Sequence, residues 1–149
     1  MVSLALYQPD IPQNVGAAIR LCACLGVTLH IIEPTGFPWK EREFKRAGMD
    51  YINHVDLVRH ISWDSFLQNT APARVILVET DGVKSVWDFT FKPDDILLMG
   101  RESAGVPTTV YSQAHATVHI PMKGLVRSMN VITAASLTLG EALRQTRYK

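Results

Sequence analysis

Three short polar stretches of this sequence contain residue types that bind ligands and take part in group transfer. The first joins Asn14 to Arg20 through a run of small residues, and the second covers residues 100–107, Gly-Arg-Glu-Ser-Ala-Gly-Val-Pro. The third holds Ser128 and Asn130, just before an apolar segment. Amides and hydroxyls both donate and accept hydrogen bonds, and the second stretch adds charge through a glutamate and an arginine. These stretches could form one ligand site only if the fold brings them together.

Arg20 has two possible explanations. Helical side chains point toward the helix N-terminus, and the neighbours one turn back, Gly16 and Ala17, are small. We therefore expect Arg20 to cross an open surface toward the Asn14 loop, leaving room for a substrate. A solvated surface arginine would give the same pattern.

The other two stretches also have structural explanations. Glycines in 100–107 permit sharp turns and close approach to a ligand, but a plain strand-to-helix loop needs them as well. Ser128 or Asn130 would cap the helix that follows, and capping needs only one of them. A capping side chain can still face a ligand held at the same helix terminus, so neither explanation excludes the other.

Alternating apolar patterns predict the elements that would position these stretches. We expect a cap at Gly26 for the first helix and at Ser62 for the third. The predicted strands cover residues 2–7, 28–32, 51–57, 74–78, 95–99 and 117–120, and the predicted helices cover 14–25, 38–47, a segment from 63, 107–112 and 131–145.

The alternation of strands and helices predicts an α/β fold with a mostly parallel sheet and helices on both faces. Strand, helix and strand follow within the first thirty or so residues, which predicts parallel pairing with a right-handed crossover. Ligands in such folds lie outside the carboxyl ends of the strands. Three strand ends carry suitable residues, at 78–80, 99–102 and 120–122.

Length and composition predict one globular domain over residues 1–149. Hydrophobic residues make up 47% and charged residues 19%, and no apolar run approaches the roughly 20 residues of a membrane span. The N-terminus lacks the pattern of a secretory signal. We therefore expect no membrane association and a cytoplasmic location.

Cysteine and histidine spacing predicts neither a disulfide nor a metal site. Cys22 and Cys24 are two apart in a predicted helix, so their side chains diverge, and we expect both to be small buried hydrophobic residues. The five histidines are scattered without zinc-ligand spacing. The sequence also lacks the phosphate-loop, dinucleotide-turn and nucleophile-elbow motifs, which excludes several common enzyme classes.

The formal net charge of +1 neither favours nor excludes a nucleic-acid partner, because binding depends on where the charge lies. The basic residues are densest in 39–46, Trp-Lys-Glu-Arg-Glu-Phe-Lys-Arg. This segment is either a solvated helix face with internal ion pairs or a phosphate-contacting surface.

Taken together, the three polar stretches resemble motifs one, two and three of the SpoU class of SPOUT RNA methyltransferases in order, spacing and flanking strands. The matching segments are Pro12-Gln13-Asn14-Val15-Gly16 with Arg20, then 100–107, then Ile120-Pro121-Met122 with 127–130. The resemblance covers nearly the whole chain. The segments 29–34 and 46–51 are similar to one subgroup, the minimal tRNA wobble-position 2′-O-methyltransferases.

This resemblance implies a C-terminal trefoil knot and a homodimer whose site uses residues of both subunits. It also implies that S-adenosylmethionine binds in the knot and leaves as S-adenosylhomocysteine. The implied cofactor-binding residues are Val78, Glu79, Thr80, Gly100, Ile120, Met122, Ser128 and Met129.

In the family, the arginine that matches Arg20 is assigned to activate the ribose 2′-hydroxyl, with Asn14, Glu102, Ser128 and Asn130 around it. A guanidinium with a pKa above about 12 is a poor base at neutral pH. Orienting the hydroxyl and stabilising the developing alkoxide is an easier role for Arg20, and the group that takes the proton stays open.

The substrate that the resemblance implies is a tRNA anticodon stem-loop, methylated at a cytidine or modified uridine in position 34. With no appended RNA-binding domain in the pattern, basic residues of the dimer would hold the RNA, with strong salt dependence. These residues would be Arg20, Arg42, Lys45, Arg46, Arg101, Lys123 and Arg127.

One departure from the subgroup leaves the target nucleotide open. The subgroup often has Pro-Glu-Thr in motif two, whereas this chain has Arg101-Glu102-Ser103. The alternatives are a 2′-O-methyltransferase for another tRNA or rRNA site and a non-catalytic RNA-binding relative. A small-molecule α/β enzyme rests on fold analogy alone.

Overall fold

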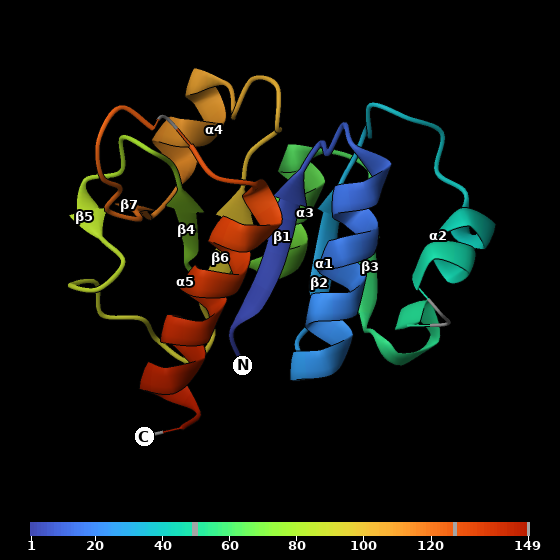
Figure 1. Cartoon of the computed structure of the whole chain (residues 1–149), viewed down its shortest axis with the longest axis horizontal. Helices are drawn as coiled ribbons and strands as arrows, with labels where there is room; N and C mark the ends of the chain where they lie inside the picture. The colour runs from blue at the N-terminus through green and yellow to red at the C-terminus, as the bar shows by residue number, and fades with distance from the viewer. Residues whose placement is uncertain (49–50, 127, 149) are drawn as a thin grey trace.

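The first strand, β1 (Ser3–Tyr7), is buried on both faces. Its side chains alternate: Leu4 and Leu6 pack into one core, and Ala5 and Tyr7 pack into a second. This pattern is typical of a parallel sheet covered by helices on both sides. A computed structural model describes residues 1–48, 51–126 and 128–148 (Figure 1). For residues 45–48 it describes the backbone alone.

Seven strands form one sheet in the order β3-β2-β1-β6-β4-β7-β5, and the paired neighbours run parallel, which confirms the predicted fold class. The elements that follow β1 are α1 (Pro12–Leu25), β2 (Leu29–Ile32), α2 (Glu41–Gly48), the 3₁₀ helix η1 (Tyr51–His54), β3 (Leu57–His60), α3 (Trp63–Thr70), β4 (Val75–Val78), β5 (Lys84–Ser85), β6 (Ile96–Met99), α4 (Thr108–Gln113), β7 (Ala116–His119) and α5 (Val131–Thr146).

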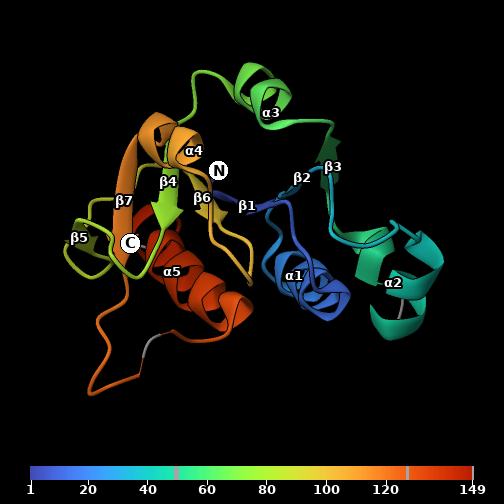
Figure 2. The same ribbon diagram turned by 90° about the horizontal axis from the view of Figure 1, so that it is seen from above.

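The helices lie on both faces of this sheet. Figure 2 shows α1, α2 and α5 on one side of the strands and α3 and α4 on the other. Ile19 of α1 and Leu139 of α5 belong to the first core, whereas Phe66 of α3 and Val110 of α4 belong to the second. The two cores therefore hold the sheet between two helical layers.

Both predicted helix caps are confirmed. Gly26 ends α1 in the left-handed conformation with φ of 65°, which glycine adopts without the strain that a Cβ would cause. The Ser62 hydroxyl accepts a hydrogen bond from the Ser65 backbone N–H at the start of α3.

Some predictions were wrong. Residues 51–54 form η1 rather than a strand, and the strand comes after them as β3. The strand β5 was not predicted, because two residues are too short to show a period of two. Cys22 is buried, which raises the pKa of its thiol to about 12, but Cys24 is exposed because it lies on the opposite side of α1.

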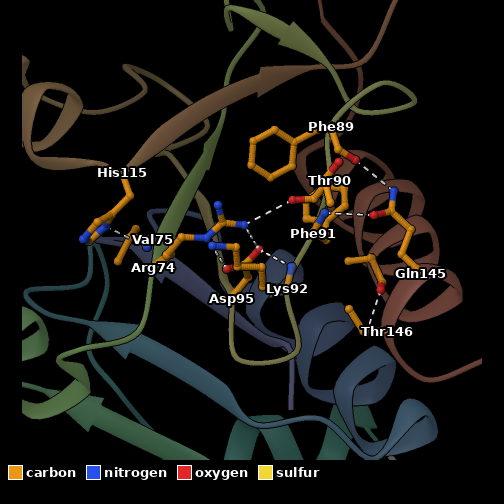
Figure 3. Close-up of polar contacts among 11 residues, drawn as sticks. Arg74, Val75, Phe89, Thr90, Phe91, Lys92, Asp95, His115, Gln145 and Thr146 are labelled. Carbon is orange, nitrogen blue, oxygen red and sulfur yellow. Dashed lines mark hydrogen bonds and ion pairs between the residues drawn. The ribbon is translucent and has the colours of Figure 1, made fainter.

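The connection between β4 and β6, residues 79–95, follows an unusual path. The strand order places β7 between β4 and β5, so this connection passes beyond β7 to form β5 and then returns to β6. On the way back it contacts α5: Gln145 Nε2 donates to Phe89 O at 2.9 Å, and Phe91 N donates to Gln145 Oε1 at 2.8 Å (Figure 3). The last helix is thereby fixed to a segment far earlier in the chain.

An ion pair anchors the end of the same connection. Arg74, just before β4, donates to Asp95 Oδ1 and Oδ2 at 2.8 and 2.7 Å, and Asp95 is almost completely buried (Figure 3). The hydrogen bonds that Arg74 donates to Asp95 raise the pKa of Arg74. Two adjacent strands, β4 and β6, are thus joined at their amino ends.

Within the described ranges, no helix combines the length and the apolar character needed to cross a bilayer.

Candidate active site

A cleft of about 620 Å³ opens where the carboxyl ends of β4, β6 and β7 meet the first turns of α1 and α5. Its walls contain residues of all three polar stretches and of all three strand ends singled out in the sequence. The volume lies within the range of about 300–1,000 Å³ that is usual for small-molecule sites. The fold therefore brings the three stretches together.

The cleft is lined by every residue that the family resemblance implies for the cofactor. Apolar side chains come from the strand ends, and backbone amides are available at the loops that follow them. The residues are Val78, Glu79, Thr80, Gly100, Ile120, Met122, Ser128 and Met129. Their binding roles remain predictions.

Four of the implied catalytic residues also line the cleft, and three of them form a hydrogen-bonded chain. Asn130 Nδ2 donates to Asn14 Oδ1 at 3.2 Å, and Asn14 Nδ2 donates to Glu102 Oε1 at 3.0 Å. The chain ends at Asp10, whose backbone N–H donates to Glu102 Oε2 at 3.2 Å. It connects the first helix, the loop after β6 and the last helix.

Asn130, not Ser128, caps the last helix. The Asn130 side-chain oxygen accepts hydrogen bonds from Ile132 N and Thr133 N at 2.8 and 3.1 Å. Ser128 is exposed and lines the cleft. Asn130 therefore stabilises the start of α5, whereas Ser128 does not cap this helix.

Two carboxyl groups in the cleft are more basic than usual. Burial raises the pKa of Glu102, and the neighbouring Asp10 carboxyl raises it further. The proximity of Glu102, together with a hydrogen bond from the Ser103 hydroxyl, lowers the pKa of Asp10. Burial and the nearby Asp81 carboxylate raise the pKa of Glu79.

Arg20 does not lie where the sequence predicted. Its guanidinium stacks over the Tyr51 ring, 5.2 Å from the ring centroid, and Arg20 is absent from the cleft lining. The aromatic face of η1 offers a cation–π contact that the open surface over Gly16 cannot provide. One subunit therefore does not bring Arg20 to Asn14, Glu102, Ser128 and Asn130.

The residues predicted to hold RNA have mixed surroundings. Arg42 on α2 and Lys123 after β7 are exposed. Arg101 is half-buried: its Nε donates to Gly105 O at 3.1 Å, and its guanidinium lies 5.5 Å from the Tyr7 ring centroid. The side chains of Lys45 and Arg46 and the whole of Arg127 lie outside the described residues.

The sequence prediction missed Asp10 and Ile11, which follow β1, whereas it had singled out Met99 at the end of β6 as part of a strand end. Ile11 and Met99 line the cleft, and Asp10 holds Glu102 from behind. Asp10 does follow a predicted strand, so the rule that ligands lie at strand ends could have found it. Its neighbours Pro9 and Pro12 show only where the strand stops, because proline cannot continue the ladder of backbone hydrogen bonds.

No group of three or more histidine, cysteine, aspartate or glutamate side chains suited to a metal ion occurs in the described part of the chain.

Residues 1–140 match the model of the SpoU rRNA Methylase family. The chain belongs to this family. A curated relative from Beijerinckia indica, named tRNA (cytidine(34)-2′-O)-methyltransferase, is 58% identical over 144 residues, which cover 95% of this chain and 90% of the relative.

Solved structures of the SpoU family share the fold. One, reported for the 2-OH methylation of C/U34 on tRNA, has a TM-score of 0.92 and 44% identity and covers 97% of this chain and 95% of its own. Another, the SpoU methyltransferase AviRb from Streptomyces viridochromogenes in complex with the cofactor AdoMet, has a TM-score of 0.86 and 26% identity and covers 97% of this chain and 60% of its own.

Proposed function

We propose that this protein transfers a methyl group from S-adenosylmethionine to the ribose 2′-hydroxyl of the tRNA wobble nucleotide, a cytidine or modified uridine at position 34. The observation that carries the proposal is the cleft in which Asn14, Glu102, Ser128 and Asn130 converge at the carboxyl ends of the strands. Support comes from relatives of nearly the same length that carry this activity in their names.

The cleft suits S-adenosylmethionine in shape and chemistry. Val78, Ile120 and Met122 offer apolar surface for an adenine ring, and the loops offer backbone groups for its polar edge. The carboxylates of Glu79 and Glu102 favour a positively charged ligand in the same space. When bound, the cofactor supplies a methyl group that is activated by its positively charged sulfur.

We further propose that the active unit is a homodimer and that Arg20 acts in the partner's cleft. In one subunit Arg20 lies outside the cleft, so the implied catalytic set is complete only if a second copy supplies it. The outer surface of α1 and α5 suits such a contact. Leu137 of α5 is 40% exposed, and a Cβ at Gly16 or Gly140 would meet nothing within 4 Å.

Exposed basic residues would hold the RNA, and we propose Lys123, which follows the cleft residue Met122, and Arg42 of α2, which lies beside β3 at the other edge of the sheet (Figure 1). With a formal net charge of +1, affinity would come from local charge and would fall steeply with salt. The compartment that we propose is the cytoplasm, where tRNA is modified.

We also infer that the C-terminal segment forms the trefoil knot that the family resemblance implies. The connection 79–95 passes around β7, and α5 is held against its returning half by Gln145. Chain-topology rules make knots rare, so this inference rests on the strand order and not on a general expectation.

The test is transfer of labelled methyl groups to tRNA from cells that lack the gene, followed by mapping of the modified nucleotide. We expect a 2′-O-methyl group at position 34. Methylation at another nucleotide would keep the chemistry but change the substrate. Absence of both methyl transfer and S-adenosylmethionine binding in calorimetry would favour a non-catalytic RNA-binding protein.

A further inference from the structure

Asp10 lies behind Glu102 and is held from three sides. Its backbone N–H donates to Glu102 Oε2 at 3.2 Å, and the Ser103 hydroxyl donates to its Oδ2. On the third side the loop after β2 packs tightly, because a Cβ at Gly36 would lie only 2.6 Å from Asp10 Cβ. Such close support fixes the position of the Asp10 carboxylate.

The second carboxylate oxygen, Asp10 Oδ1, is buried and has no hydrogen-bond donor among the described residues. A buried acceptor without a partner is costly, and each one in a folded protein calls for an explanation. The Glu102 carboxyl is next to Asp10, since its Oε2 accepts from the Asp10 backbone N–H, and the two carboxyl groups can form a hydrogen bond only when one of them carries a proton. The site therefore has a place for one additional proton.

We propose that Asp10 is a positioning residue for methyl transfer, and that the Asp10–Glu102 pair receives the proton of the ribose 2′-hydroxyl. This inference rests on the proposed function. Glu102 lines the cleft and would take the proton directly, whereas Asp10 acts through Glu102.

The surroundings of Glu102 favour this role. Burial and the Asp10 carboxyl raise the pKa of Glu102, which makes its ionised form a stronger base than an ordinary glutamate. Other charged groups nearby are turned elsewhere. The Arg101 guanidinium lies over Tyr7, and Glu79 Oε1 lies beside Gly105, 2.9 Å from where a Cβ would stand.

The step balances in atoms and electrons. A lone pair of the ribose O2′ forms a bond to the methyl carbon, and the carbon–sulfur bond pair returns to sulfur. The proton of the 2′-hydroxyl moves to Glu102, where it can be shared with Asp10 Oδ1, and leaves to solvent after product release. The additional proton then provides the hydrogen-bond donor that Asp10 Oδ1 lacks.

The first test is the pH dependence of single-turnover methyl transfer in the full-length protein. Glu102→Gln should lower the plateau rate by about 10²–10⁴-fold, the usual contribution of a positioned base. Asp10→Asn should move the acid limb of the pH–rate profile to lower pH, because Glu102 becomes a weaker base. For the same reason it should lower the plateau rate about tenfold. Asp10→Glu, which keeps the charge, should restore the limb toward that of the natural protein.

The matched control is Asp88→Asn, the same chemical change at an exposed carboxylate in the connection 79–95. It should leave the pH profile unchanged. A profile for Asp10→Asn that coincides with that of the natural protein would overturn the proposal.

A second readout does not depend on activity. Carboxyl-carbon NMR titration of the protein without cofactor should show that Asp10→Asn lowers the pKa of Glu102. If Asp10→Asn fails to fold, the reciprocal measurement applies: Glu102→Ala should raise the pKa of Asp10. Unchanged titration of the remaining carboxyl would reject the pair, whereas a shifted titration in a protein without methyltransferase activity would reject only the proposed function.

Discussion

At the residue scale, the amide of Asn130 links the start of α5 to the cleft. Its oxygen accepts from Ile132 N and Thr133 N, and its nitrogen donates to Asn14. A single side chain therefore contributes both to helix stability and to the geometry of the residues that we propose to be catalytic. The two contributions can be separated because they use different atoms.

Asn130→Asp should separate them. The aspartate keeps the capping oxygen and places negative charge at a helix N-terminus, so the melting temperature should not fall. It loses the donor to Asn14, so we expect methyl transfer to drop about tenfold or more, as when a preorganised group is removed. Thermal melts and single-turnover rates measure the two effects.

The control is Ser62→Ala, which removes the cap of α3, the helix on the face opposite α1 and α5. It should cost about 1 kcal/mol of stability without lowering the rate measured below the melting transition. If Asn130→Asp lost activity only in proportion to stability, Asn130 would be a cap and nothing more.

Ser128→Ala gives a complementary prediction at the same loop. Ser128 is exposed and makes no capping bond, so its replacement should leave the melting temperature unchanged. We expect a rise in the dissociation constant for S-adenosylmethionine, measured by calorimetry. An unchanged dissociation constant and rate would remove Ser128 from the site.

The sequence allowed most of these residues to be identified, but not their connections. Asn14, Glu102 and Asn130 stand in recognisable motifs, whereas the chain of hydrogen bonds between them depends on side chains more than eighty residues apart. Arg20 shows the limit most clearly. Its orientation follows from Tyr51, a residue that sequence patterns had placed in a strand.

At the element scale, a pair of histidines joins β2 and β3. His30 Nδ1 lies 3.0 Å from His60 Nε2, and Asn69 Nδ2 lies 3.3 Å from His60 Nδ1. Burial lowers the pKa of His30 to about 4, with a further contribution from His60, and burial lowers the pKa of His60 as well. Both rings are therefore held neutral in the folded protein at neutral pH.

The lowered pKa values of this histidine pair predict that the folded protein loses stability in acid. The unfolded chain binds protons on these histidines once the pH falls below the usual pKa of 6.5, whereas folded His30 does so only near 4. Stability that is present above pH 6.5 should thus be lost as the pH falls toward 4. Urea unfolding at a series of pH values in this window measures the loss.

His30→Gln should make the loss smaller, because glutamine can still bond to His60 but does not titrate. The matched control is His54→Gln, at an exposed position in η1, which should leave the pH dependence as it is. Equal slopes for His30→Gln and the natural protein would show that the pair does not control acid stability.

Element boundaries were predictable where local signals are strong. Gly26 and Ser62 mark helix ends through backbone conformation and a side-chain cap, and both signals are local. In contrast, β5 exists only because β7 lies beside it, with Lys84 paired to Val118. A two-residue strand has no sequence pattern of its own, so only tertiary pairing reveals it.

At the scale of the whole molecule, the cleft is assembled from residues at both ends of the chain, and a second copy is proposed to complete it. The walls run from Ile11 to Ala134, and Arg20 of the same subunit is not among the lining residues but lies over Tyr51. The family resemblance implied both properties, but periodicity and spacing alone predict neither, because both depend on how distant segments of the chain and two copies of it come together.

Mixing two inactive variants tests the proposed dimer. Arg20→Ala and Glu102→Gln each disable both sites of their own dimers. Random re-association should give mixed dimers with one intact site each, so about a quarter of the natural number of sites returns. Single-turnover amplitude after mixing and subunit exchange measures this fraction.

Light scattering of each variant before mixing controls for loss of the dimer itself. If both variants are dimers and the mixture stays as inactive as its components, Arg20 does not act across subunits.

The position of α5 has a consequence for synthesis of the protein. Ile132, Ala135 and Leu139 cover the strands β1, β4 and β6 and are synthesised after all three of these strands. Until they emerge, the apolar face that they cover stays open to water and to chaperones. A nascent chain that has not reached α5 therefore lacks the cleft wall that Val131 and Ala134 provide. We expect premature termination before α5 to yield a product that is exposed to degradation rather than a partly active enzyme.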